Sequence, residues 1–187
     1  MKKVLAVCGS PRVSGNTAFL LRTMVEDLVA AGGDAKFLML SNLSIEDCNG
    51  CLICEETDCT GDCSINDDMQ KTVIPELLST DALILGTPSY FDLPSAQLKR
   101  FMDRTNMILS KLTNKSLALG IVVTGQSEIP SLKATCEAVR NYCRICHMKE
   151  SRKSPILVIA RDVGDASKNL EAIKSVKALG RNLAGIK

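Results

Sequence analysis

Short apolar runs and longer amphipathic stretches alternate five times along this chain of 187 residues. The short runs end at turn-forming residues, as buried strands do, and the longer stretches repeat their apolar side chains at helical spacing. Strands that alternate with helices predict a parallel sheet covered by helices on both faces. We therefore expect an α/β fold with a five-stranded, doubly wound parallel sheet, its strands at residues 3–8, 35–40, 82–86, 117–123 and 156–160.

The expected helices lie between these strands and after the last one. Pro75 predicts a kink or a break in the helix over residues 69–79, because proline disrupts a helix interior. Pro94 suits the first turn of the helix that extends to about residue 109. The remaining helices are expected at residues 20–29, 131–147 and 166–183. The length fits one domain, residues 1–187, in which a cysteine-rich stretch at about 41–66 is an insertion after the second strand.

Composition excludes several classes of function. Aromatic residues make up only 3% of the chain, too few for a platform that stacks single-stranded nucleic acid. The sequence holds no apolar run of about 18 residues, so we expect no membrane partner. Five apolar residues before Gly9 are too few for the apolar core of a signal peptide, which predicts a cytoplasmic location.

The turn after the first strand combines hydroxyl groups with one guanidinium group. In an open parallel sheet ligands bind beyond the carboxyl ends of the strands, where the following helix offers free N–H groups to an anion. The turn lacks the lysine of a nucleotide triphosphatase and the glycine pattern of a dinucleotide site, which leaves a phosphate monoester. A helix cap formed by Ser14 or Asn16 is the simpler alternative. The candidate residues are Ser10, Arg12, Ser14, Gly15, Asn16 and Thr17.

Two further loops are expected at the same edge of the sheet. The loop at residues 87–93 contains one of two tyrosines and one of four phenylalanines, a pair suited to flank a flat heterocycle. The alternative is that this loop packs on its own core. The loop after the fourth strand, residues 124–127, offers backbone contacts. The candidate residues are Pro88, Ser89, Tyr90, Phe91, Thr124 and Gly125.

Five of the nine cysteines fall within sixteen residues, at positions 48, 51, 54, 59 and 63. A Cys-x-x-Cys-x-x-Cys run with one distal cysteine is the ligand pattern of a [4Fe–4S] cluster. Zinc sites more often use two separated cysteine pairs, and disulfide chemistry or solvated thiols are further alternatives. The three-cysteine run favours a cluster held by Cys48, Cys51, Cys54 and either Cys63 or Cys59.

These motifs resemble the NADPH-dependent FMN reductase-like flavoproteins, which have a flavodoxin-like fold. The residues that carry the likeness are the turn at 9–17, Thr87-Pro88-x-Tyr90 and the helix residues 97–104. The cysteine run followed by Asp67-Asp68-Met69 is similar to the iron–sulfur flavoprotein branch. Cys63 keeps that branch's spacing to Asp67 and is preferred as the fourth ligand, although the eight-residue gap after Cys54 is longer than usual.

The resemblance implies one FMN and one [4Fe–4S] cluster per subunit, with electrons passing between them. Ser10, Arg12, Ser14, Asn16 and Thr17 would hold the phosphate, and Pro88, Ser89 and Tyr90 would line the flavin ring. It also implies a homodimer or homotetramer, and ferredoxin or a small-molecule electron acceptor as partner. The second glycine expected after Gly125 is absent, and so is a glycine-rich loop that some members use to reach a neighbouring subunit.

An FMN-dependent oxidoreductase of this kind needs no catalytic acid or base from the protein, because the cofactors carry the chemistry. The alternatives are an NAD(P)H-dependent FMN reductase and a redox-sensing protein whose cysteine loop holds zinc or a disulfide. Residues 143–147 match the pattern of c-type haem attachment. However, Cys136, Cys143 and Cys146 fall on one helical stripe, which predicts buried core residues.

Charge is strongly segregated along the chain. Residues 41–98 contain eleven acidic residues and one basic residue, a net charge of −10, whereas residues 99–187 have a net charge of +10. Opposite charges favour contact between surfaces. We therefore expect the acidic insertion of one subunit to lie against a basic helix of another, with contact inside one subunit as the alternative.

Overall fold

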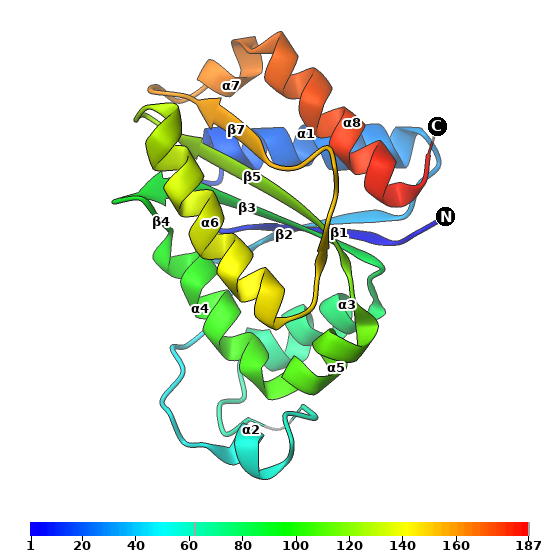
Figure 1. Cartoon of the computed structure of the whole chain (residues 1–187), viewed down its shortest axis with the longest axis vertical. Helices are drawn as coiled ribbons and strands as arrows, with labels where there is room; N and C mark the ends of the chain where they lie inside the picture. The colour runs from blue at the N-terminus through cyan, green and yellow to red at the C-terminus, as the bar shows by residue number, and fades with distance from the viewer. Residues whose placement is uncertain (62, 187) are drawn as a thin grey trace.

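A seven-stranded sheet forms the centre of the computed structural model, which describes residues 1–61 and 63–186 (Figure 1). The long strands are parallel and follow the order β2-β1-β3-β5-β7, the order of a flavodoxin-like fold. The predicted α/β class is confirmed. These strands are β1 (Val4–Cys8), β2 (Ala35–Met39), β3 (Ala82–Tyr90), β5 (Ala118–Gly125) and β7 (Ile156–Ile159).

The predicted number of five strands was wrong, because two further strands have only two residues each. Strand β6 (Lys149–Glu150) pairs with the start of β5 and shares that edge with β7. Strand β4 (Leu93–Pro94) pairs antiparallel with the end of β3. Segments this short contain too little alternation of apolar and polar residues to predict a strand.

The segment expected to be a loop at residues 87–93 is a β-hairpin. Its turn consists of Phe91 and Asp92, whose φ angles are 51° and 62°. Positive φ at both central residues is typical of the two-residue turns that match the twist of paired strands. Pro94 therefore lies in β4 and not in the first helical turn, and Ser95 caps the helix that follows.

Helices cover both faces of the sheet. One face packs against α1 (Asn16–Ala30), α7 (Asp165–Lys168) and α8 (Leu170–Ala184). The other packs against the π-helical turn η2 (Met69–Val73), α3 (Ile74–Ser79), α4 (Ala96–Arg104), the 3₁₀ turn η3 (Thr105–Ile108), α5 (Leu109–Lys115) and α6 (Ile129–Ile145). The helix predicted to extend to residue 109 is divided by η3. The predicted terminal helix is divided at Asn169, whose side chain caps α8.

Successive side chains of each strand point to opposite faces of the sheet, which creates two hydrophobic cores. Leu5 and Val7 of β1 belong to the core under α3, α4 and α6. Val4 and Ala6 belong to the core under α1 and α8. All four side chains are fully buried, because the central strand of a covered parallel sheet has no exposed face.

The cysteine-rich insertion leaves the sheet after the 3₁₀ turn η1 (Leu40–Asn42) and returns at η2. Its described part contains one short helix, α2 (Ile53–Glu56), and lies beyond α4 and α5 at one end of the molecule (Figure 1). Among the described residues, no helix is long and apolar enough to cross a membrane.

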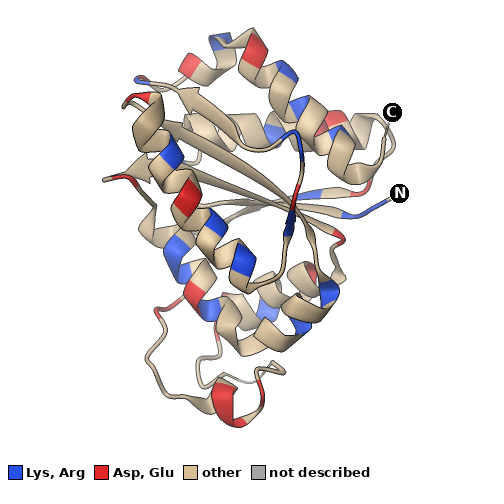
Figure 2. Ribbon diagram, viewed as in Figure 1, with Lys and Arg blue, Asp and Glu red and all other residues tan. Residues whose placement is uncertain are grey.

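The two oppositely charged parts of the chain meet within one subunit (Figure 2). Arg100 Nε lies 2.6 Å from Asp47 Oδ1, and Arg104 Nη1 lies 2.7 Å from Asp67 Oδ2. At these two ion pairs the acidic and the basic part of the chain contact each other within one subunit, which was the alternative to contact between subunits.

Candidate functional site

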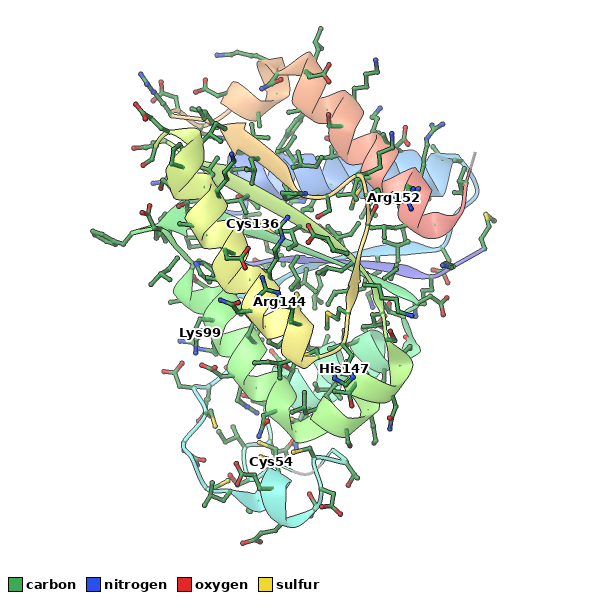
Figure 3. All side chains as sticks on the ribbon, in the orientation of Figure 1. Cys54, Lys99, Cys136, Arg144, His147 and Arg152 are labelled. Carbon is green, nitrogen blue, oxygen red and sulfur yellow. The ribbon has the colours of Figure 1, made fainter. Side chains whose placement is uncertain are left out.

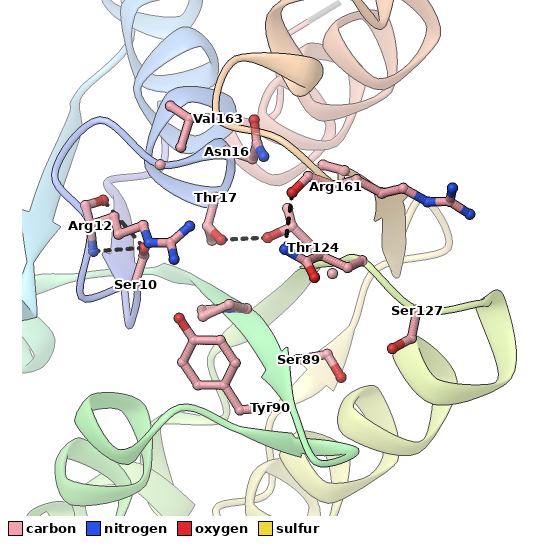
Figure 4. Close-up of a pocket in the computed structure, with 15 residues that line it drawn as sticks. Ser10, Arg12, Asn16, Thr17, Ser89, Tyr90, Thr124, Ser127, Arg161 and Val163 are labelled. Carbon is pink, nitrogen blue, oxygen red and sulfur yellow. Dashed lines mark hydrogen bonds between the residues drawn. The ribbon is translucent and has the colours of Figure 1, made fainter.

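A cavity of about 220 Å³ lies where the loops after β1, β3, β5 and β7 meet at the carboxyl edge of the sheet (Figure 4). Ten of the twelve predicted cofactor-binding residues line it. The lining residues are Ser10, Arg12, Gly15, Asn16, Thr17, Pro88, Ser89, Tyr90, Thr124, Gly125, Gln126, Ser127, Ala160, Arg161 and Val163.

The turn after β1 forms an anion cradle in front of α1. Ser10 Oγ accepts a hydrogen bond of 3.1 Å from the backbone N–H of Arg12, which folds the turn back on itself. Among the described residues no side chain caps α1, and its first turn contains no acidic residue. The free N–H groups and the positive end of the helix dipole therefore favour a phosphate at this position.

Gly15 lies in close contact with the other residues of the cradle. A Cβ atom on Gly15 would lie 3.1 Å from the carbonyl oxygen of Arg12 and 3.2 Å from Ser10 Oγ. These separations are shorter than ordinary van der Waals contact, so a larger residue would displace the turn. The φ angle of Gly15 is −75°, and the constraint is therefore one of space and not of backbone conformation.

Thr17 and Thr124 join the cradle to the loop after β5. Their hydroxyl oxygens are 2.7 Å apart, and both side chains are buried (Figure 4). A buried hydrogen bond between two different loops fixes their relative position, because either hydroxyl alone would lack a partner.

Asn16 forms hydrogen bonds to the loop that follows β7. Its Oδ1 accepts hydrogen bonds from the N–H groups of Gly164 and Ala166, at 3.2 and 3.1 Å. Its Nδ2 donates to the carbonyl oxygen of Asp162 at 2.9 Å. The amide of Asn16 therefore anchors residues 162–166 while its side chain lines the cavity.

The sequence analysis missed this fourth loop, from which Ala160, Arg161 and Val163 line the cavity. The available signal was its place after the fifth strand, at the edge where the other three loops end. Gln126 Nε2 donates to the carbonyl oxygen of Arg161 at 3.0 Å, while the guanidinium group of Arg161 extends away from the centre of the cavity (Figure 4).

Two predicted residues do not line the cavity. Phe91 is fully exposed at the tip of the hairpin, and Ser14 lies outside beside Phe19 and Arg22. Tyr90, 44% exposed, is the aromatic side chain at the cavity wall, opposite Asn16 and Val163 (Figure 4). The expected aromatic pair is therefore reduced to one ring on the described structure.

Ser95 fastens α4 to two of the cavity loops. Its Oγ donates to the carbonyl oxygen of Gly9 and accepts from the N–H of Leu98, while its N–H donates to Thr87 Oγ1 at 3.0 Å. All of these bonds are buried. The N-terminus of α4 is thus fixed directly behind the loops that follow β1 and β3.

The four predicted cluster ligands divide into two pairs. Cys54 and Cys63 are half-buried against the core, whereas Cys48 and Cys51 are exposed. Cys54 Sγ accepts a hydrogen bond of 3.3 Å from Asn106 Nδ2, and Cys63 Sγ accepts one of 3.6 Å from Arg104 Nη2. The Cys51 and Ser64 side chains are 3.0 Å apart, and this hydrogen bond lowers the pKa of the Cys51 thiol.

Cys59 differs from the other cysteines of the insertion. Its backbone N–H donates to the carbonyl oxygen of Cys54 at 2.7 Å. Burial, followed by the neighbouring Cys54, Glu55 and Asp58, raises the pKa of the Cys59 thiol.

Across residues 1–61 and 63–186, no three metal-ligating side chains converge on one point. The donor chemistry of the insertion nevertheless fits an iron–sulfur cluster. It provides the Cys-x-x-Cys-x-x-Cys run and a distal cysteine, and N–H or O–H groups lie beside three of these four thiols, as is usual around cluster sulfurs.

Asp67, Asp68 and Arg104 join the two ends of the insertion by hydrogen bonds. Asp67 Oδ2 accepts from the N–H of Glu46 at 2.8 Å, and Arg104 Nη1 donates to the carbonyl oxygen of Glu46 at 2.9 Å. Asp68 Oδ2 accepts from the N–H of Ser44 at 2.8 Å. Burial favours the neutral form of Asp67, but Arg104 and two backbone N–H groups outweigh it and hold the pKa of the carboxyl below its ordinary value.

The C-terminal cysteines behave as core residues. Cys136 and Cys143 of α6 are buried together with Cys146, the residue that follows this helix, and burial raises the pKa of Cys136 to about 11. His147 is exposed at a positive φ just after α6. This arrangement agrees with the packing interpretation of residues 143–147.

Sequence comparison matches residues 2–159 to the NADPH-dependent FMN reductase family. An iron-sulfur flavoprotein of Methanocaldococcus jannaschii is 32% identical over 78% of this chain and 74% of its own. An iron-sulfur flavoprotein of Archaeoglobus fulgidus is 30% identical over 98% of this chain and 94% of its own.

Solved structures support the fold. An NAD(P)H:quinone oxidoreductase from Methanothermobacter marburgensis superposes with a TM-score of 0.74 at 17% identity, over 97% of this chain and 96% of its own. A WrbA-like flavodoxin from Agrobacterium tumefaciens gives a TM-score of 0.69 at 15% identity, over 99% and 96% of the two chains. At such identities the likeness concerns the fold alone.

Proposed function

The chain belongs to the NADPH-dependent FMN reductase family and is a flavin-dependent oxidoreductase, and we propose that it passes electrons between FMN and a [4Fe–4S] cluster. The observation that carries the flavin half is the uncapped N-terminus of α1 behind Ser10 and Arg12. The cluster half is supported by the four cysteines and by the relatives that are named iron-sulfur flavoproteins.

In this proposal the cradle binds the FMN phosphate. Ser10, Arg12 and Thr17 provide polar groups, Gly15 leaves the space, and the first-turn N–H groups of α1 complete the site. Asn16 holds the fourth wall in place. FMN, when bound, supplies one- and two-electron chemistry, so no catalytic acid or base is asked of the protein.

The walls of the cavity orient the flavin ring. Pro88 and Tyr90 approach from the end of β3, and Thr124 and Gly125 from the end of β5. Ser89 Oγ lies 2.7 Å from Thr135 Oγ1, which holds this part of the wall against α6. The half-exposed ring of Tyr90 borders the opening through which a small electron acceptor would reach the flavin.

Cys48, Cys51, Cys54 and Cys63 would hold the cluster, which supplies one-electron chemistry when bound. Eight acidic residues between positions 46 and 68 surround these cysteines in the sequence. Negative charge disfavours the addition of an electron, so these residues are expected to lower the reduction potential of the cluster.

Metal and flavin analysis of anaerobically purified protein tests the proposal. About one FMN, four iron atoms and four acid-labile sulfides per chain are expected. One zinc without iron would favour the redox-sensing alternative. Bound FMN without any metal, together with rapid reduction by NAD(P)H, would favour a simple FMN reductase.

The partners and the assembly also belong to this proposal. Asp47 and Asp67 already pair within the subunit, but the remaining charge of the two oppositely charged parts favours a homodimer or homotetramer in which the insertion contacts a basic helix of another subunit. Ferredoxin or a small acceptor is the proposed redox partner. A monomer in light scattering at low salt would contradict the assembly. Cell fractionation tests the expected cytoplasmic location.

A further inference from the structure

One continuous segment connects the two proposed cofactor sites. Ser95, at the start of α4, is bonded to the loops that line the flavin cavity. The same segment continues through α4, which ends at Arg104, into η3, which contains Asn106. Both residues contact the cysteine insertion. Cys54 lies in the insertion directly beyond this segment (Figure 3).

Each half-buried cysteine of the insertion receives one N–H group from this segment. Asn106 Nδ2 donates to Cys54 Sγ, and Arg104 Nη2 donates to Cys63 Sγ. Within the described part of the chain, Cys59 receives no such donor from α4 or η3. The hydroxyl of Ser110 in α5 instead donates to the backbone carbonyl oxygen of Cys59 at 2.9 Å.

An amide and a guanidinium gain little from a neutral thiol, because the sulfur of a thiol is a weak acceptor. The same N–H groups gain much more when the sulfur is ionised, since a hydrogen bond to a charged partner is about twice as strong. The half-buried site reduces screening by water and strengthens this difference. The placement of two donors on these two sulfurs therefore favours sulfur atoms that carry negative charge.

Resting on the function proposed above, we propose that Asn106 and Arg104 are positioning residues that select Cys54 and Cys63 as ligands and raise the reduction potential of the bound cluster. Reduction adds negative charge to the cluster and its ligands, so N–H donors stabilise the reduced form. Their effect opposes that of the eight acidic residues between positions 46 and 68.

Asn106 provides the cleaner test. Arg104 also forms a buried ion pair with Asp67, and its replacement would disturb the fold. Asn106 is only half-buried, and within the described chain its side-chain amide bonds to the insertion through Cys54 Sγ alone. Asn106→Leu removes the donor at similar size, and Asn106→Gln keeps a donor. Ser110→Ala is the matched control, because Ser110 contacts the same insertion through a backbone carbonyl.

The experiment is a redox titration of anaerobically purified holoprotein, in which the reduced cluster is followed by electron paramagnetic resonance and the flavin by absorbance. In Asn106→Leu the ratio of reduced to oxidised cluster at a fixed potential is expected to fall about tenfold, a shift of about 59 mV for one electron. Asn106→Gln should recover much of this shift. The flavin potential and the Ser110→Ala variant should match the wild type.

The outcomes separate the inference from the proposed function. Wild-type protein without iron would overturn both. If the wild-type protein contains the cluster but the cluster potential is the same in wild type and in Asn106→Leu, the inference alone would be overturned. Loss of the cluster in Asn106→Leu, with retention in Asn106→Gln and Ser110→Ala, would support the positioning role. Should Asn106→Leu fail to fold by circular dichroism, Asn106→Ala takes its place as the variant without a donor, and a cluster potential equal to that of Ser110→Ala would overturn the inference.

Discussion

The guanidinium group of Arg104 and the carboxylate of Asp67 form an ion pair of 2.7 Å in which both side chains are almost completely buried. Arg104 belongs to α4, and Asp67 stands where the cysteine insertion returns to the core. The pair therefore attaches the insertion to the helical layer at the point where its two ends come together.

Replacement of Asp67 by Asn is expected to lower the free energy of unfolding by about 3–5 kcal/mol, because it leaves the charge of Arg104 buried without a partner. Urea unfolding at neutral pH measures the change. Asp103→Asn is the control, since the exposed Lys99–Asp103 pair contributes at most about 0.5 kcal/mol. An equal decrease in the free energy of unfolding in the two variants would show that the buried pair stabilises the fold no more than the exposed pair does.

The stability conferred by Asp67 should depend on pH in one direction. Its pKa is lowered in the folded protein, so its contribution is complete above the ordinary carboxyl pKa of about 4 and is lost as the pH falls through the folded value. The difference in unfolding free energy between wild type and Asp67→Asn should thus be constant from pH 7 to about 5 and narrow at lower pH. A difference that stays constant down to pH 3 would contradict this assignment.

Asn16→Ala is expected to weaken FMN binding about tenfold, or about 1.4 kcal/mol. The variant loses three hydrogen bonds to residues 162–166, so the fourth wall of the cavity is no longer fixed. Quenching of FMN fluorescence measures the affinity. Asn141→Ala, an exposed position on α6, provides the control and should bind as the wild type does.

Gly15→Ala tests the space inside the cradle. The added methyl group would lie 3.1 Å from the Arg12 carbonyl oxygen, so the turn must move and FMN affinity should fall at least about tenfold. The melting temperature of the FMN-free protein should change by only a few degrees, because the backbone conformation of Gly15 suits alanine. Unchanged affinity would mean that the phosphate does not bind against this turn.

Substitution of single cysteines should distinguish the fourth ligand. Cys63→Ser is expected to lose most of the iron, whereas Cys59→Ser should retain nearly all of it, because only Cys63 lies beside an N–H donor of α4. Iron and sulfide analysis after anaerobic purification provides the comparison. The opposite result would assign the ligand to Cys59 and remove Arg104 from the site.

The turn of the proposed phosphate cradle was predictable because its determinants lie next to one another in the sequence. Residues 10–17 follow a buried strand and precede a helix, and this local order predicts an anion site. The core of the parallel sheet was predictable for a similar reason, since each long strand contains its own apolar pattern.

Features that depend on distant residues were not predictable in this way. Asp67 and Arg104 are 37 positions apart, and no local pattern shows that they pair. The role of Asn16 depends on a loop almost 150 residues away. Phe91 was placed in the flavin site from its type and its neighbours, but a hairpin turn directs it to solvent.

The hydrogen bonds that join the two ends of the cysteine insertion have a consequence for how this fold can gain or lose a redox centre. Ser44 and Asp68 bond directly across the base of the insertion, as do Glu46 and Asp67. Residues 47–66, which lie between these bonds, can therefore change in length and in their metal-binding side chains without a change in the strands or in the flavin cavity. Exchange of residues 47–66 for a short polar turn should leave a stable flavin-binding protein, and another metal-binding loop could be grafted onto the same base.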